Sequence, residues 1–302
     1  MPWISINSRS GVSGEFKRLP TPDQRRMLPS GSLPFNLVDI DNLDRVLNGI
    51  PEIFPEYKNK KTLLVEGYYP PKFGVWSAHK LYRIKFRADG TEKYVVAKKM
   101  PKVYGEKEFS ILFRLSNLLS VPKPFHFLYD CELESDGFPD VQGILWMTYI
   151  EHRFNFNEYI LKWCIEESEI SYFEKMHGLL TSIWSLGIKH NDLKGEHLLL
   201  GGDGWSIIDF EKSKVGAAPI GEKDMDDEIS VLLGDFTVYM DRFIFYHGIK
   251  FSGDVKSRYE KFISEFLNCF GIEVLESRYL PLFMRTVKNE ELRASIEKIE
   301  KR

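Results

Sequence analysis

The pattern of apolar and polar residues divides the chain into a strand-rich part and a helix-rich part. From about residue 62, runs of β-branched and aromatic residues predict strands, and Ala88-Asp89-Gly90-Thr91 supplies a favourable hairpin turn. Apolar residues at helical spacing, among them Phe109 and Leu112, predict a helix over residues 107–119. The predicted strands cover residues 62–69, 75–86, 92–100, 124–133 and 141–150.

After residue 151 the pattern is mainly helical, with one short β-like hairpin around the turn 201–204. The arms of that hairpin are predicted at residues 197–200 and 205–210. The order of these elements predicts an α+β, bilobal architecture with a five-stranded N-lobe containing one helix and a mainly helical C-lobe. The helices predicted for the C-lobe cover residues 155–166, 168–186, 224–246, 254–271 and 288–300.

The organisation of the chain follows from the same change of pattern. Residues 1–57 are predicted to be a loose N-terminal extension, because their first part is rich in Ser, Gly, Pro and Arg and lacks clean periodicity. Residues 58–150 form the predicted N-lobe and residues 151–302 the predicted C-lobe, with the boundary near 149–152.

Composition narrows the classes of function. The 302 residues are 43% hydrophobic, which is enough apolar material for a substantial core. A formal net charge of −3 gives no support to a nucleic-acid or membrane-surface partner, and no uncharged apolar run approaches the length needed to span a membrane. The three cysteines are far apart and lack metal-ligand spacing, so we expect reduced thiols and a cytoplasmic location.

Two carboxylates mark the candidate chemistry. Asp192 lies in His190-Asn191-Asp192-Leu193-Lys194, and Asp209 lies in Ile207-Ile208-Asp209-Phe210-Glu211. They flank the two arms of the predicted hairpin, which would bring them together at one end. Phosphoryl transfer requires a carboxylate that orients the attacking hydroxyl, oxygen ligands for Mg²⁺ and a cation on the phosphates.

These two segments resemble the catalytic loop H-R-D-L-x-x-x-N and the metal-binding D-F-G of the protein-kinase superfamily. The resemblance implies that Asp192 is the catalytic carboxylate and that Lys194 is the cation near the transferred phosphoryl group. It also makes Asp209 the Mg²⁺ ligand, with His190 and Phe210 packed behind. The cosubstrate it implies is ATP, bound in the cleft between the lobes.

His197 stands where the family has an asparagine that binds the second metal ion. Imidazole prefers softer metals than Mg²⁺, so a weak second metal site, or tolerance of Mn²⁺, is expected if His197 is a ligand. If it is not a ligand, it packs behind the loop as a spacer.

The strand before the predicted helix contains Val96-Ala97-Lys98-Lys99, which resembles the family's V-A-I-K. The resemblance makes Lys99 the phosphate-binding lysine and Ala97 a part of the adenine pocket. Lys98 is the competing choice, and strand alternation would point it the other way. The partner on the helix is expected to be Glu108, with Glu106 as the alternative.

The remaining nucleotide-binding residues are assigned by position in the family pattern. The resemblance places Met147 beside the adenine, the backbone of Tyr149 and Ile150 at the base, and Leu199 below it. The glycine-rich loop is degraded, and Gly74, after Phe73, is what remains of its tip. The nucleotide-binding residues expected from the resemblance are Lys99, Glu108, Ala97, Gly74, Met147, Tyr149, Ile150 and Leu199.

Residues 212–222 are short and are not followed by A-P-E, so a long activation segment is not expected. The resemblance to atypical and small-molecule kinases implies that an acid near the start of the next helix braces the catalytic loop, with Asp224, Asp226 and Asp227 as equal candidates. Ordinary acidic charges at a helix N-terminus are an equally good interpretation of these residues.

The sequence therefore predicts an ATP-dependent phosphotransferase, most simply an atypical serine/threonine protein kinase. A small-molecule kinase acting on a sugar or glycan alcohol is the alternative, favoured by His197 and by the missing A-P-E. A nucleotide-binding pseudokinase is the third possibility, favoured by the degraded glycine loop.

Overall fold

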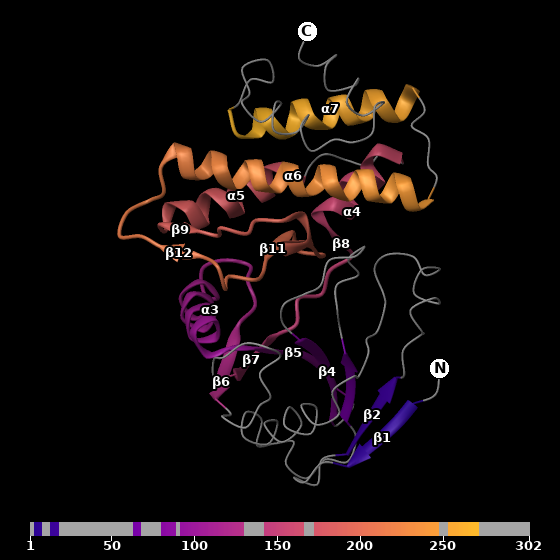
Figure 1. Cartoon of the computed structure of the whole chain (residues 1–302), viewed down its shortest axis with the longest axis vertical. Helices are drawn as coiled ribbons and strands as arrows, with labels where there is room; N and C mark the ends of the chain where they lie inside the picture. The colour runs from indigo at the N-terminus through magenta and orange to yellow at the C-terminus, as the bar shows by residue number, and fades with distance from the viewer. Residues whose placement is uncertain are drawn as a thin grey trace. The chain divides into compact units, whose positions relative to one another are not determined.

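The computed structural model describes residues 3–7, 13–17, 63–67, 80–88, 91–129, 142–165, 172–247 and 253–271 (Figure 1). The chain has mixed helix and sheet content and divides into two compact units. The first unit comprises residues 1–118 and 122–149, and the second comprises residues 119–121 and 150–302.

The first unit is built on one mixed sheet. Its neighbouring strands pair antiparallel, except that β2 and β3 run parallel. The hairpin of β4 and β5 has Ala88 opposite Thr91, as the predicted turn requires. In spatial order the strands are β1 (Trp3–Asn7), β2 (Ser13–Lys17), β3 (Leu63–Gly67), β4 (Lys80–Ala88), β5 (Thr91–Pro101), β7 (Gln142–Thr148) and β6 (Pro124–Tyr129).

Within the described residues the sheet has seven strands, where the sequence predicted five. The two additional strands, β1 and β2, lie in the segment that was expected to be loose, so that expectation is wrong for these residues. Both are short, and β2 joins the sheet by pairing with β3, which is far away in the sequence. A partner at that separation leaves no local pattern from which the pairing could be predicted.

Helix α3 (Lys102–Leu115) follows β5 directly and begins before the predicted start at residue 107. It packs close to the sheet because Gly105 on the helix and Gly143 on β7 have no side chain. The ring of Phe127 fills the space next to both glycines. A Cβ atom at either glycine would overlap that ring. Ile111, Leu112 and other apolar residues of this helix are buried.

The second unit is mainly helical and has an aromatic core. Ring centroids of Phe156 and Phe266 are 5.7 Å apart, and those of Phe173 and Phe262 are 5.3 Å apart. Phe236 is fully buried with them. The predicted helix at 288–300 lies outside the described residues. The helices of this unit are α4 (Phe156–Ile165), α5 (Tyr172–Ser185), α6 (Glu222–His247) and α7 (Gly253–Cys269).

Short strands of the second unit position two loops. In the hairpin of β10 (Leu198–Leu200) and β11 (Trp205–Ile207), Leu198 lies opposite Ile207. Strands β9 (Ile188–Lys189) and β12 (Lys214–Val215) pair with Lys189 opposite Lys214. The loop from β9 to β10 and the loop from β11 to β12 are therefore bracketed by the same two pairings and lie side by side. The first loop ends in the 3-10 turn η2 (Gly195–His197), and β8 (Phe154–Asn155) completes the sheet beside β10.

None of the described helices has both the length and the apolar character required to cross a membrane.

Candidate active site

The two loops of the second unit share an unusual backbone feature. Asn191 and Asp209 have positive φ angles of 63° and 70°, a region that Asn and Asp tolerate better than most residues. The Asn191 amide Nδ2 donates to the carbonyl of Lys212 at 3.2 Å, and so ties the first loop to the second. This arrangement brings Asp192 and Asp209 together, as the predicted hairpin implied.

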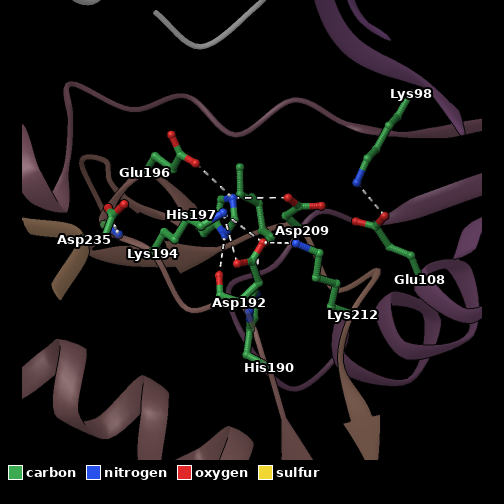
Figure 2. Close-up of polar contacts among 12 residues, drawn as sticks. Lys98, Glu108, His190, Asp192, Lys194, Glu196, His197, Asp209, Lys212 and Asp235 are labelled. Carbon is green, nitrogen blue, oxygen red and sulfur yellow. Dashed lines mark hydrogen bonds and ion pairs between the residues drawn. The ribbon is translucent and has the colours of Figure 1, made fainter. Parts of the chain in front are cut away.

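The Asp192 carboxylate accepts hydrogen bonds from two ammonium groups (Figure 2). Lys194 Nζ lies 3.0 Å from Oδ1 and 3.1 Å from Oδ2, and Lys212 Nζ lies 2.9 Å from Oδ2. Burial by itself would raise the pKa of Asp192, but the hydrogen bonds from Lys212 and Lys194 outweigh it and lower that pKa below its usual value. Asp192 is therefore ionised at neutral pH and acts as a hydrogen-bond acceptor.

His197 bridges from the backbone of Asp192 to the carboxylate of Asp209. Its Nδ1 lies 2.8 Å from the carbonyl oxygen of Asp192, which can only accept, so Nδ1 carries a proton. Its Nε2 lies 3.1 Å from Asp209 Oδ2 and 3.5 Å from Glu196 Oε1. Burial lowers the pKa of His197, but the charge and hydrogen bond of Asp209 outweigh burial and the pKa is raised. Nε2 thus faces carboxylate oxygens of Asp209 and Glu196, where it can either carry a proton or bind a metal cation.

His190 lies behind the loop, and its ring centroid is 5.1 Å from that of Phe210. Its Nε2 donates to the carbonyl of Ile208 at 2.9 Å, which ties the base of one loop to the other. Burial lowers the pKa of His190 to about 4, so this imidazole is neutral under ordinary conditions. The sequence analysis placed both residues behind the carboxylates and did not predict their mutual contact.

The acid that braces the first loop is Glu228 on α6. Its Oε2 accepts the backbone N–H of His190 at 2.9 Å and its Oε1 accepts that of Asn191 at 2.6 Å. Burial raises the pKa of Glu228, and the two backbone hydrogen bonds oppose that rise. An acid that holds two backbone N–H groups of the loop fixes its path directly.

This corrects the expectation that the brace is Asp224, Asp226 or Asp227. Asp224 and Asp227 instead bind the ammonium of Lys189, at 2.7 and 3.1 Å. The signal for Glu228 was present in the helical pattern, because it lies one turn before the buried Leu232. An acid at such a buried position requires polar partners.

A second acid of α6, Asp235, holds the turn after the loop. Its Oδ2 accepts the backbone N–H of Gly195 at 3.0 Å and the side-chain amide of Asn157 at 2.9 Å. A Cβ at residue 195 would overlap the Asn157 amide, so this approach requires glycine. The sequence analysis did not find this group. Its signal is the spacing of Asp235 two turns after Glu228, on one face of the helix.

In the first unit, the lysine that pairs with Glu108 is Lys98. Its ammonium lies 2.8 Å from Glu108 Oε2, and the two side chains are 5% and 1% exposed (Figure 2). The expected pairing of Lys99 with Glu108 is therefore wrong, and Glu106 instead lies 3.8 Å from Lys102. Adjacent residues of a strand point to opposite faces of the sheet. A shift of the strand register by one residue therefore changes which of the two lysines is on the face of Glu108.

The strand register supports the same conclusion. Met147 on β7 lies opposite Val96, and Ala97 lies opposite Trp146. Residues directly opposite share a face, so Met147, Val96 and Lys98 lie on one face of the sheet and Ala97 on the other. Val96, not Ala97, thus shares a face with both Lys98 and Met147.

The structure gives partial information on the other predicted nucleotide residues. The backbone N–H of Tyr149 donates to the backbone carbonyl of Tyr94 at 3.4 Å. The backbone carbonyl oxygen of Ile150 lies 3.0 Å from His152 Nδ1. Leu199 is buried in β10. Gly74 lies outside the described residues. Binding of a base by these residues stays a prediction.

A metal site is compatible with the two loops. Asp192, His197 and Asp209 each offer one ligand atom, and these atoms lie within 4.8 Å of one another. His197 donates its other ring N–H to a backbone carbonyl, the usual arrangement behind a histidine ligand. Two carboxylates and one imidazole therefore fit a divalent cation, with oxygen as the majority donor.

No protein-family model matches the chain, and no curated protein matches it in sequence. Among solved structures, one of WaaP in complex with acyl carrier protein is similar over 86% of this chain and 96% of that chain, with 13% identity and a TM-score of 0.42. The kinase PK-1 of Cydia pomonella granulovirus is similar over 61% of this chain and 62% of that chain, with 17% identity and a TM-score of 0.37. Similarity this weak assigns neither a fold nor an activity to the chain.

Proposed function

We propose that the chain is an ATP-dependent phosphotransferase that transfers the γ-phosphoryl group of ATP to a hydroxyl group. The observation that carries this proposal is the arrangement on the two loops of the second unit. There an ionised Asp192 is bound by Lys194, and His197 bridges from the backbone of Asp192 to the carboxylate of Asp209. A carboxylate, a cation and a metal-compatible cluster are the groups that phosphoryl transfer requires.

Each residue has a role that follows from its contacts. Asp192 accepts a hydrogen bond from the attacking hydroxyl and orients it, while the ammonium of Lys194 balances negative charge on the transferred group. Asp209 and His197 would hold the divalent cation, Mg²⁺ or Mn²⁺. Such a cation, when bound, neutralises the charge of the nucleotide phosphates.

The buried pair of Lys98 and Glu108 is the proposed phosphate-binding group of the first unit. Glu108 holds the ammonium in one position, and a buried ammonium that is already oriented binds an anion at a small entropic cost. The sequence analysis favoured Lys99 as the phosphate-binding lysine, and we propose Lys98 instead. For the adenine pocket we likewise propose Val96 in place of Ala97, because Val96 shares a face with Lys98 and Met147.

A small-molecule alcohol is the better-supported acceptor, although a protein hydroxyl was the first expectation from the sequence. Between Phe210 and α6 the chain has residues 211–221, whose one strand is β12, and that strand pairs with β9 of the same unit. So short a segment, with its strand already paired inside the unit, favours an acceptor smaller than an extended peptide.

Turnover of labelled ATP tests the proposal. Wild-type protein with Mg²⁺ is incubated with a generic protein acceptor and, separately, with a metabolite extract, and the labelled product is identified. Asp192→Asn should lower the rate by about 10²–10⁴-fold and leave ATP affinity nearly unchanged, because the carboxylate acts in the transition state. Asp203→Asn, an exposed turn residue of the same unit, is the matched control and should keep the wild-type rate.

Tight ATP binding without turnover by the wild type would contradict the proposal and support a pseudokinase. An Asp192→Asn variant as active as Asp203→Asn would remove Asp192 from the reaction.

A further inference from the structure

The carboxylate of Asp192 binds two lysine ammonium groups, one more than a simple ion pair contains. Lys194 and Lys212 both donate to its carboxylate, and both reach Oδ2. Two ammonium groups thus share one carboxylate at the position where the acceptor must arrive. The family resemblance accounts for Lys194 and leaves Lys212 without a role.

The two lysines are held differently. Lys194 adjoins Gly195, whose N–H is fixed by Asp235, and its side chain is 29% exposed. The side chain of Lys212 is 51% exposed. Its backbone is nevertheless fixed beside the site, because its carbonyl accepts the Asn191 amide. The ammonium of Lys212 can therefore leave Asp192 while the rest of the residue stays in place.

The segment after Lys212 carries a second exposed lysine. Ser213 is fully buried, and Lys212 and Lys214 on either side of it are exposed. Lys212 ends a turn and Lys214 begins β12, and both side chains reach solvent. Lys189, opposite Lys214, has two acidic partners of its own in Asp224 and Asp227.

We propose that Lys212 binds an anionic group of the acceptor, so that the acceptor is an alcohol with a phosphate or carboxylate close to the reacting hydroxyl. The proposal rests on the phosphotransferase function and specifies its substrate class. The anion binds the ammonium of Lys212, and the hydroxyl donates to Oδ2 of Asp192 in place of Lys212, while Lys194 stays bound to that carboxylate. Since Nζ and Oδ2 are 2.9 Å apart, anion and hydroxyl must lie near each other on one small molecule.

Binding of three related alcohols tests the proposal without requiring turnover. Glycerol, glycerate and glycerol 3-phosphate share hydroxyl groups and differ in the anion, and each is titrated by ligand-observed NMR at constant ionic strength, without nucleotide or metal. We expect one or both anionic alcohols to bind measurably more tightly than glycerol. The tighter of the two identifies the anion as carboxylate or phosphate.

Variants assign that binding to Lys212. Lys212→Met should weaken binding of the preferred anion by about tenfold or more, the usual effect of losing a charged hydrogen bond. Lys212→Arg keeps the charge and should retain most of the affinity. Lys214→Met removes the same charge two residues away and should have little effect. Thermal unfolding of each variant verifies that it is folded.

Equal affinity for all three alcohols would overturn the proposal, as would equal losses in Lys212→Met and Lys214→Met. The outcome is separable from that of the proposed function. Anion binding that depends on Lys212, in a protein that never turns over ATP, would retain the anion site and refute the phosphotransferase.

Discussion

The buried pair of Lys98 and Glu108 and the lysine cluster around Asp192 are built in opposite ways. In the first unit, Lys98 and Glu108 form a one-to-one pair whose side chains are 5% and 1% exposed. In the second unit, Asp192 is shared by Lys194 and Lys212, and Lys212 is 51% exposed. A buried pair is fixed because separating it leaves an uncompensated charge, whereas an exposed ammonium can exchange partners at little cost. The first site suits a permanent role and the second suits exchange with a substrate.

The largest effect should come from breaking the buried pair. Lys98→Met or Glu108→Gln removes one partner and should lower the free energy of unfolding by about 3–5 kcal/mol, together with activity. The double variant should lose much less than the sum of the two single losses, because the charges act as one unit. Denaturant unfolding and ATP turnover of the four proteins measure this.

Lys99→Met is the matched control for this pair, since it removes a neighbouring buried lysine of the same strand. If Lys99→Met shows the same coupling to Glu108→Gln that Lys98→Met shows, the assignment of the pair to Lys98 is wrong.

An intermediate effect should come from the support beneath Asp192. Glu228→Gln keeps one oxygen acceptor and loses one of its two hydrogen bonds to the loop, at His190 or Asn191. A buried N–H without an acceptor costs about 1–3 kcal/mol, so both stability and the turnover rate should fall. Chemical denaturation and steady-state kinetics measure the two effects.

The control is Asp227→Asn on the same helix, where the acid is 55% exposed and pairs with Lys189. An exposed ion pair of this kind contributes at most about 1 kcal/mol. Losses of the same size in both variants would show that Glu228 does not brace the loop.

The smallest effect should come from His197→Asn, which keeps one of the two contacts of His197. The Asn amide N–H can donate to the Asp192 carbonyl, and the amide oxygen is then available, together with Asp209, to a bound cation. Replacing imidazole by a hard oxygen donor should raise activity with Mg²⁺ relative to Mn²⁺. Metal titrations of turnover, and of Mn²⁺ binding by itself, measure the change. An unaltered preference in both would make His197 a spacer and leave Asp209 as the metal ligand.

The sequence predicted the parts of the candidate site that are local. The hairpin of β10 and β11 and the order of strands and helices around it follow from short-range patterns. That hairpin brings Asp192 and Asp209 together, because the start of one arm and the end of the other lie at the same end. The segment 190–197 likewise contains Asp192, Lys194 and His197 at spacings that their contacts require.

What only the tertiary structure decided are the contacts between elements that are distant in the sequence. Lys98 and Lys99 are neighbouring residues of the same type, and the register of the strand determines which of them reaches Glu108. Glu228 reaches the loop because the packing of α6 brings one face of that helix to its N–H groups, and β2 is a strand because β3 pairs with it. Local propensity determines which elements form, whereas the choice among equivalent side chains depends on the face that each element buries.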